Sequence, residues 1–369
     1  MVVGKVAIAI AGITIALFAI AATIVISLIT LYVPNRSVSV SAYQKCLTVA
    51  SNFATTVTGP VANIVNTVGV TTSCAQFSTV SCPGTMTNGI CTWQRKLAVT
   101  CIDGSTVRIR VQSNGLPTRC VVVPLTATVK EHNIDFEVDF NPKVSVKSPL
   151  YSPTTQSQLN GILCNVSTQD SAPSSSNLVA YSIEKYLSTM AGISIDNVVI
   201  LNVNSGDSAD PFYPPTGYEQ EGIDSCLSHP QASGVYHYHV ASGCAVSPPV
   251  GNITSCGIDN SCITNVAGYM ISTWPSSAKK LTVIGIAKDG HVIYGPYLNT
   301  GELISSGVDI CNGMFYDSIG NYAYFATTKY PYITGCFGPG NYPSFGPTCT
   351  TNGQSSYTMS KYAAVKASG

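Results

Sequence analysis

Fourteen cysteines, all placed after an apolar N-terminal segment, constrain the fold of this 369-residue chain more than any other feature. Their number is even, and none forms the Cys-x-x-Cys pairs typical of structural zinc sites. We therefore expect a disulfide-stapled extracellular fold with up to seven bridges. The sequence leaves their connectivity open. The cysteines are Cys46, Cys74, Cys82, Cys91, Cys101, Cys120, Cys164, Cys226, Cys244, Cys256, Cys262, Cys311, Cys336 and Cys349.

The apolar N-terminal segment is long enough to cross a bilayer. Residues 6–33 contain no charged side chain, and about 20 apolar residues suffice for a membrane-spanning helix. The apolar core of a signal peptide is shorter, about 7–15 residues. We therefore predict an uncleaved signal-anchor helix in residues 1–40, with cleavage near Ala19-Ile20-Ala21 as the alternative. A third possibility is a helix that packs with copies of itself in a filament, because small residues such as Ala9 and Gly12 permit close helix packing.

Charge and glycosylation motifs agree with an extracellular location. The net charge is zero and only 10% of residues are charged, against about 25% in an ordinary soluble domain. No basic patch favours binding of nucleic acid or of anionic lipid. A neutral surface rich in Ser, Thr and Tyr suits a protein that contacts glycans or copies of itself. N-glycosylation triplets occur at Asn35, Asn165 and Asn252.

Strand patterns dominate the first part of the chain after this segment. Apolar runs at 97–102 and 106–112 flank the turn pair Asp103-Gly104 and predict a β-hairpin. Residues 134–140 alternate between apolar and acidic side chains, which predicts a further strand. Its acidic face fits the solvated side of an edge strand better than a calcium site. The acidic residues are Asp135, Glu137 and Asp139.

The predicted fold class is α+β, mostly β, with two domains after the N-terminal helix. Residues 177–192 have helical periodicity and end at Gly192, a residue typical of helix C-caps. We therefore assign residues 41–205 to a β-rich α+β domain with disulfides. A segment rich in Pro, Gly and Tyr then leads into a disulfide-rich β domain, residues 206–350. Residues 351–369 are predicted to form a frayed polar tail.

Residues 236–239, Tyr-His-Tyr-His, contain two of the five histidines in the chain. Side chains alternate between the two faces of a strand, so His237 and His239 would project from one face, about 7 Å apart. Tyr236 and Tyr238 would project from the other. Such a histidine pair is either part of a metal site or a polar pair in a packed sheet.

From residue 206 to 340 the chain resembles the YHYH-domain family. Five blocks occur in the family's order: IDSCLSHP (223–230), GVYHYHV (234–240), VIGIAKDGHVIYGPY (283–297), VDICNG (308–313) and YPYITGCFGPG (330–340). The resemblance implies an extracellular domain without a defined reaction, because the family is largely uncharacterised. Ala323 stands where the family often has a second Tyr-His-Tyr, and His291 stands where it usually has an aromatic residue. The positions that the resemblance marks are Asp224, Cys226, His229, His237, His239, Asp289, Asp309, Cys311, Asn312 and Cys336.

Two functional hypotheses follow. In the first, the chain is a non-enzymatic cell-surface or matrix protein that uses its YHYH domain as a rigid interaction or self-assembly module. In that case the histidines hydrogen-bond backbone groups and hold strands together, which is the interpretation the sequence favours. In the second, His237 and His239 bind a transition metal with His229 and Asp309, or with Asp289 in its place. Imidazole and carboxylate ligands suit zinc, copper or iron better than calcium.

Other chemistry has no support in the sequence. There is no Gly-x-Ser-x-Gly elbow and no His-Glu-x-x-His helix. Eight tyrosines between residues 294 and 342 could form a surface for glycan or protein contact, but we expect most of them in the core. The sequence therefore makes enzymatic activity the less favoured hypothesis.

Overall fold

The computed structural model describes residues 20, 40–75, 82–121, 127–146, 151–170, 187–251, 253–257 and 259–363. The chain divides into two compact units, Met1–Ser41 and Ala42–Gly369. The predicted apolar helix of residues 1–40 lies outside the described residues apart from Ile20 and Val40. Within the described part of the chain, no helix combines the length and the apolar character needed to cross a membrane.

The described part of the second unit is mostly β, as predicted, and the helices found there are short. In chain order its elements are α2 (Ala42–Ala50), β1 (Val70–Cys74), β2 (Thr85–Thr87), β3 (Ile90–Arg95), β4 (Leu97–Ile102), β5 (Arg108–Ser113), β6 (Ile134–Asp139), α3 (Gln156–Leu163), η1 (Val166–Gln169), β7 (Met190–Ser194), β8 (Val199–Leu201), β9 (Ser228–Pro230), β10 (Tyr236–Tyr238), η3 (Gly243–Ala245), α4 (Ser261–Thr264), α5 (Val266–Ser272), η4 (Ser276–Ala278), β11 (Val283–Ala287), β12 (Val292–Tyr294), β13 (Gly313–Phe315) and β14 (Tyr322–Phe325).

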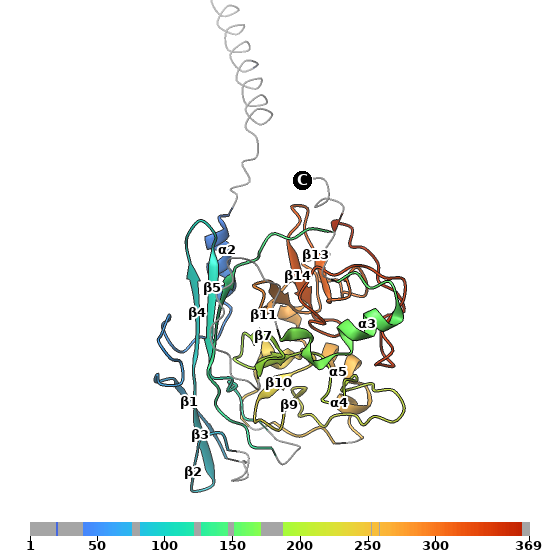
Figure 1. Cartoon of the computed structure of the whole chain (residues 1–369). Coiled ribbons are helices and arrows are strands. Elements are labelled where there is room, and N and C mark those ends of the chain that lie inside the picture. Colours follow the sequence, from blue (N-terminus) through green and yellow to red (C-terminus); the bar gives the residue numbers. More distant parts are fainter. Residues whose placement is uncertain are drawn as a thin grey trace, which may run out of the picture. The chain divides into compact units, whose positions relative to one another are not determined.

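The described strands form three sheets. Two of these are three-stranded, with the orders β1-β3-β2 and β4-β5-β6. The third has eight strands in the order β13-β14-β12-β11-β7-β8-β10-β9, and Figure 1 shows several of them side by side. At its centre, β7 and β11 run antiparallel, with Ile193 opposite Ile286. Among the family positions marked in the sequence, His229 and His237 lie in strands of this sheet, and the others lie outside its strands.

The boundary predicted at residues 205 and 206 does not separate two compact units. Strands β7 and β8 precede it, yet β7 pairs with β11 and β8 pairs with β10, both of which follow it. Residues Ala42–Gly369 form one unit as a result. The Pro- and Gly-rich segment after residue 205 is therefore a long connection between strands of one sheet.

The predicted hairpin is confirmed as β4 and β5, and the strand at 134–140 as β6. Strand β6 lies at the edge of its sheet, but its acidic side chains are buried rather than solvated. Arg110 donates two hydrogen bonds to Asp135, and Arg108 forms an ion pair with Glu137. The prediction of a solvated acidic face is wrong because every residue of β6 is buried, and cross-strand arginines balance the charges of Asp135 and Glu137. The opposite face of the sheet joins an apolar cluster with residues of the eight-stranded sheet.

The helix predicted for residues 177–192 does not extend to its expected end. Residues 177–186 lie outside the described residues, and Met190–Ser194 form strand β7. Gly192 is therefore a strand residue, not a C-cap. A Cβ atom at Gly192 would lie 2.3 Å from the carbonyl oxygen of Ile286. The glycine allows a close approach of β11 instead of ending a helix.

All fourteen cysteines are paired, and no free cysteine remains. Seven disulfides are typical of an extracellular or secreted protein. Residues 351–363, predicted as part of a frayed tail, contact the core at several points, since Tyr357, Ser360 and Ala363 are buried. The bridges are Cys46–Cys101, Cys74–Cys120, Cys82–Cys91, Cys164–Cys349, Cys226–Cys244, Cys256–Cys262 and Cys311–Cys336.

Most tyrosines of the C-terminal part lie in the core, as expected. Four of them are buried almost completely, and their rings form two edge-to-face pairs, Tyr322 with Tyr324 and Tyr330 with Tyr332. Each keeps a hydrogen-bond partner for its hydroxyl group, as buried tyrosines usually do. These residues are Tyr322, Tyr324, Tyr330 and Tyr332.

Candidate metal centre

Three histidines meet at one edge of the eight-stranded sheet. Strands β9 and β10 run antiparallel and place His229 directly opposite His237, while His239 follows the end of β10. The ring centroids of His229 and His237 are 4.5 Å apart, and those of His237 and His239 are 4.6 Å apart. One nitrogen from each of the three rings lies within 4.8 Å of the others. The structure thus brings together the three histidines that the metal hypothesis selected.

Backbone carbonyl groups fix the orientation of two of these rings. The Nδ1 atom of His237 lies 2.9 Å from the carbonyl oxygen of Val235, and the Nδ1 atom of His239 lies 2.7 Å from that of Asn202. A carbonyl oxygen only accepts hydrogen bonds, so both Nδ1 atoms carry the hydrogen. In a neutral imidazole the lone pair is then on Nε2. These two Nε2 atoms face each other at 2.9 Å.

Burial keeps these rings neutral. Burial, together with the nearby His229 and His239, lowers the pKa of His237 well below its ordinary value. Burial also lowers the pKa of His239 to about 4, although the negative charge of Glu221 acts in the opposite direction. Neutral imidazole is the form that binds a metal. The two facing lone pairs therefore lie in an environment that disfavours a proton between them.

Glu221 adds a carboxylate that the sequence analysis did not select. Its Oε2 atom lies 3.1 Å from Nε2 of His229 and 3.5 Å from Nε2 of His239. Burial alone would raise the pKa of Glu221, but its contact with the His229 ring, together with its electrostatic interaction with His239, outweighs burial and lowers that pKa. Glu221 lies in a loop, eight positions before His229, with no strand pattern around it. No short motif in the sequence marks this residue.

Asp309 is not part of this group, contrary to the predicted ligand set. Its carboxylate accepts hydrogen bonds from the hydroxyl of Tyr322 and from the backbone N–H groups of Cys311, Gly313 and Gly340. Asp309 therefore anchors a turn elsewhere in the sheet. Its burial raises its pKa to about 7, despite these hydrogen bonds.

Asp289, the other aspartate considered for the site, is also engaged away from the histidine cluster. Its Oδ2 atom accepts a hydrogen bond from the hydroxyl of Tyr324 at 2.6 Å and lies 2.9 Å from Nδ1 of His291. Neither Asp289 nor His291 borders the cavity at the three histidines.

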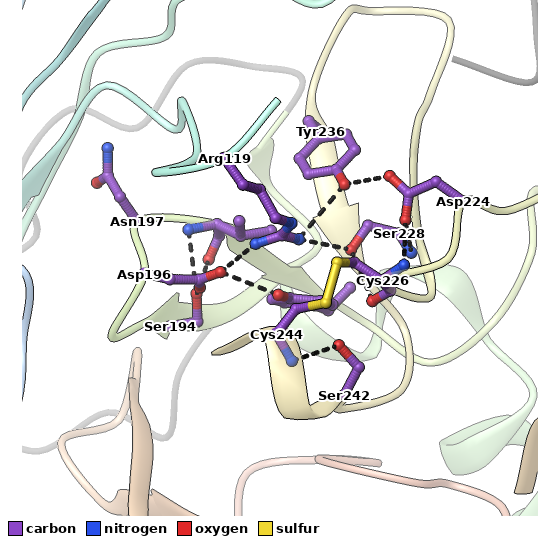
Figure 2. A network of polar contacts seen from close by, with 12 residues as sticks. Arg119, Ser194, Asp196, Asn197, Asp224, Cys226, Ser228, Tyr236, Ser242 and Cys244 are labelled. Atoms are coloured by element: carbon purple, nitrogen blue, oxygen red, sulfur yellow. Dashed lines mark hydrogen bonds and ion pairs between the residues drawn. A yellow bond between two sulfur atoms is a disulfide. The ribbon is translucent and has the colours of Figure 1, made fainter. Parts of the chain in front are cut away.

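The opposite face of β10 rests on a buried ionic network (Figure 2). Arg119 is completely buried and forms an ion pair with Asp196. Its guanidinium lies 5.5 Å and 5.3 Å from the ring centres of Tyr236 and Tyr238. Tyr238 donates a hydrogen bond to Asp196, and Tyr236 donates one to Asp224. Contacts with this network thus fix both tyrosines of the tetrapeptide on one face of β10, while both histidines project from the other face.

A cavity of about 630 Å³ adjoins the histidines. Its volume lies within the range of about 300–1,000 Å³ that is usual for small-molecule sites. Both apolar and amide side chains line it, among them Leu201, Asn204 and Gln231, together with Glu221 and the three histidines. A bound ion at this position would therefore have space beside it for water or a small ligand.

Of the predicted glycosylation positions, the structure describes one. Asn165 is exposed and precedes η1, where its side chain accepts a hydrogen bond from the backbone of Ser167. Asn35 and Asn252 lie outside the described residues.

Comparison with known proteins identifies the domain that carries the histidines. A family model described as "YHYH protein" matches residues 159–306. The match starts earlier than the expected residue 206 and ends before Asp309. No curated protein matches the chain, and neither does any solved structure. Residues 159–306, which include the three histidines, Glu221 and the central strands of the large sheet, are thus a YHYH domain.

Proposed function

We propose that this protein binds one transition-metal ion through His229, His237 and His239, with Glu221 beside the ion as a fourth group. The observation that carries the proposal is the 2.9 Å separation of the two Nε2 atoms of His237 and His239, each of which presents a lone pair. Two acceptors this close repel each other unless a cation lies between them. Burial disfavours a proton, so a metal ion is the better candidate.

The distances support binding of a single ion. Zinc–imidazole and zinc–carboxylate bonds are about 2.0–2.2 Å long, so two ligand atoms of one ion lie at most about 4.4 Å apart. Three separations in the structure are below that limit: 2.9 Å between the Nε2 atoms of His237 and His239, 3.1 Å between Nε2 of His229 and Oε2 of Glu221, and 3.5 Å between Nε2 of His239 and Oε2 of Glu221. The hydrogen bonds from Nδ1 to backbone carbonyls are those usually found behind metal-ligating histidines.

The donor set narrows the class of metal. Three imidazoles and one carboxylate suit zinc, copper, iron or manganese better than calcium or magnesium, which prefer oxygen ligands. The adjoining cavity allows a water molecule or a small ligand to reach the ion. A metal-binding YHYH domain that presents its ion to a cavity is therefore the function we propose.

The test uses the protein purified without chelator. Elemental analysis and zinc titration of the stripped protein are expected to give one ion per chain. His237→Ala/His239→Ala is expected to abolish binding, and Glu221→Gln to weaken it about 10- to 100-fold, the usual effect of losing a group that supports a site. With cobalt in place of zinc, visible absorption reports the coordination geometry.

Two variants control for loss of a histidine and of an acidic side chain. His291→Ala removes a buried histidine outside the cluster, and Glu219→Gln removes an exposed neighbour of Glu221. Both are expected to retain one zinc ion per chain. Wild-type protein that takes up no zinc, copper, iron or manganese, or a double variant that keeps its full metal content, would contradict the proposal.

We further propose that the chain acts at the cell surface, anchored or self-assembled through the apolar residues 6–33. The absence of charge in this segment and the seven disulfides of the following unit support this. The full-length protein is expected to require detergent for solubility, or to sediment as large assemblies without it. A full-length chain that stays monomeric in buffer would contradict both forms of the proposal.

A further inference from the structure

The eight-stranded sheet has the same arrangement of strands in its two halves. From the centre outward, one half runs β7, β8, β10, β9, and the other runs β11, β12, β14, β13. The pairings also agree: β7–β8 and β11–β12 are antiparallel, β8–β10 and β12–β14 are parallel, and β10–β9 and β14–β13 are antiparallel. Strand order and strand direction are therefore those expected of two halves related by an approximate two-fold axis between β7 and β11.

The register agrees residue by residue at the centre. An irregularity interrupts the β7–β8 ladder between Met190 and Gly192, and another interrupts the β11–β12 ladder between Val283 and Gly285. Across the axis, the backbone N–H of residue 195 donates to the carbonyl of residue 284 at 2.9 Å. Reciprocally, the N–H of residue 288 donates to the carbonyl of residue 191 at 2.7 Å. Strand order alone requires neither an irregularity at the same position in both halves nor a reciprocal pair of hydrogen bonds between them. Both features therefore support the equivalence of the two halves.

The same aspartate turn precedes the outer strand of each half. Asp224 accepts hydrogen bonds from the backbone N–H groups two and four residues later and from the hydroxyl of Tyr236. Asp309 accepts from the N–H groups two and four residues later and from the hydroxyl of Tyr322. In both turns the residue three positions after the aspartate has a positive φ, 61° at Leu227 and 64° at Asn312.

A second aspartate and a disulfide are repeated as well. Tyr238 donates to Asp196 at 3.0 Å, and Tyr324 donates to Asp289 at 2.6 Å. In each half, the cysteine two residues after the turn aspartate forms a disulfide with a cysteine that follows the tyrosine strand. These bridges are Cys226–Cys244 and Cys311–Cys336.

The two halves differ at the metal ligands. By strand register, Met314 corresponds to His229 and Ala323 to His237, since each pair lies opposite its partner in the same ladder. Phe325 then corresponds to His239. All three replacements are buried in an apolar cluster. The second half thus has the same frame, with apolar side chains at the three ligand positions.

We propose that β7–β10 and β11–β14 are two copies of one folding unit, and that the second copy is a metal-free counterpart of the metal centre. The part of this inference that concerns the ion rests on the proposed function. It implies that Met314, Ala323 and Phe325 occupy a latent metal position, which three histidines would convert into a second site for the same class of transition metal.

The test transplants the ligands. Zinc content is measured for the wild type and for Met314→His/Ala323→His/Phe325→His, after near-ultraviolet circular dichroism has confirmed folding. We expect the count to rise from one to two ions per chain. The same substitutions in a His237→Ala/His239→Ala background are expected to give one ion. If the triple variant does not fold, Met314→His/Phe325→His keeps Ala323 and is read by cobalt absorption.

Several outcomes would overturn the inference. A folded triple variant whose zinc count stays at that of the wild type shows that the two positions are not equivalent, while the metal centre itself stands. Loss of folding in both transplant variants also contradicts it, because an equivalent position must accommodate the imidazoles. If the wild type binds no metal, the proposed function fails instead. A comparison that does not depend on metal then tests whether the two halves are copies of one folding unit.

That comparison uses the repeated hydrogen bonds. Tyr238→Phe and Tyr324→Phe remove equivalent bonds to Asp196 and Asp289. With chelator present, both variants are expected to lower the thermal unfolding midpoint, by amounts that agree within about a factor of two. A large decrease for one variant and none for the other would contradict the duplication, whatever the metal content.

Discussion

Arg119 shows how much a single residue contributes behind the tetrapeptide. Its side chain is completely buried, and its charge is balanced by Asp196. Tyr236 and Tyr238 pack around the guanidinium, so the strand that carries His237 and His239 rests on a fixed charge pair. Burial lowers the pKa of Arg119. The electrostatic interactions of its guanidinium with Tyr236, Tyr238 and Asp196 outweigh burial and raise that pKa well above the ordinary value.

Replacing Arg119 by leucine is expected to destabilise the fold by about 3–5 kcal/mol, because it leaves the carboxylate of Asp196 buried without its counter-charge. The measurement is chemical unfolding of the wild type, Arg119→Leu, Asp196→Asn and the double variant. The double variant is expected to be more stable than the sum of the two single losses predicts. Strictly additive losses would contradict a direct coupling between the two groups.

At the same scale, the three histidines could be predicted from the sequence, whereas the charged residues that contact them or support their strand could not. His237 and His239 stand out because they belong to the Tyr-His-Tyr-His motif in a chain with few histidines, and His229 stands out because it lies in the preceding family block. Glu221 and Arg119 carry no such mark. Glu221 comes from a loop and Arg119 from a segment more than a hundred residues before the tetrapeptide, so only the folded chain brings them to the site.

At the scale of elements, glycines at the centre of the large sheet allow β7 and β11 to approach. A Cβ atom at Gly192 would lie 2.3 Å from the carbonyl oxygen of Ile286, and one at Gly285 would lie 2.7 Å from that of Ile193. Periodicity could not reveal this role. A glycine after an apolar run is typical of a helix C-cap, and the close contact comes from a strand about ninety residues away along the chain.

Gly192→Ala is therefore expected to lower the free energy of unfolding by about 1–3 kcal/mol, the usual cost of overpacking. Urea unfolding followed by fluorescence measures the change. Gly206→Ala is the matched control, because a Cβ atom there meets nothing within 4 Å. A Gly192→Ala variant as stable as the Gly206→Ala control would show that β7 and β11 are not packed as described.

At the scale of the whole molecule, the chain after residue 41 is one unit held by seven disulfides. Cys164–Cys349, with a sequence separation of 185, joins the end of α3 to the C-terminal segment. Because β7 and β8 lie between β11 and β10 in the sheet, residues on both sides of 205 depend on each other.

A fragment that begins at residue 206 is consequently expected not to fold cooperatively, even with its internal disulfides formed. It loses β7 and β8, which separate β10 from β11, and it loses the partner of Cys349. Residues 42–369 are expected to give a single unfolding transition. Calorimetry of the two polypeptides checks this, and a cooperative transition in the shorter one would support the domain boundary at 205.

The sequence by itself determined the chemistry that is local or compositional. The even cysteine count predicted a fully cross-linked unit, period-two patterns predicted β4, β5 and β6, and the tetrapeptide with its neighbouring blocks identified the YHYH domain. Tertiary structure alone decided the partners: which cysteines pair, that Glu221 and not Asp309 lies beside the histidines, and that the chain after residue 41 has no boundary at 205. A repeated Asp-x-Cys and Tyr-x-Tyr pattern was present in the sequence, but its meaning required strand register. The chemical type of each side chain, and much of the local structure, is set by the neighbouring sequence. Which side chains lie close together depends on pairings between strands that are distant in the chain, and no local pattern encodes those pairings.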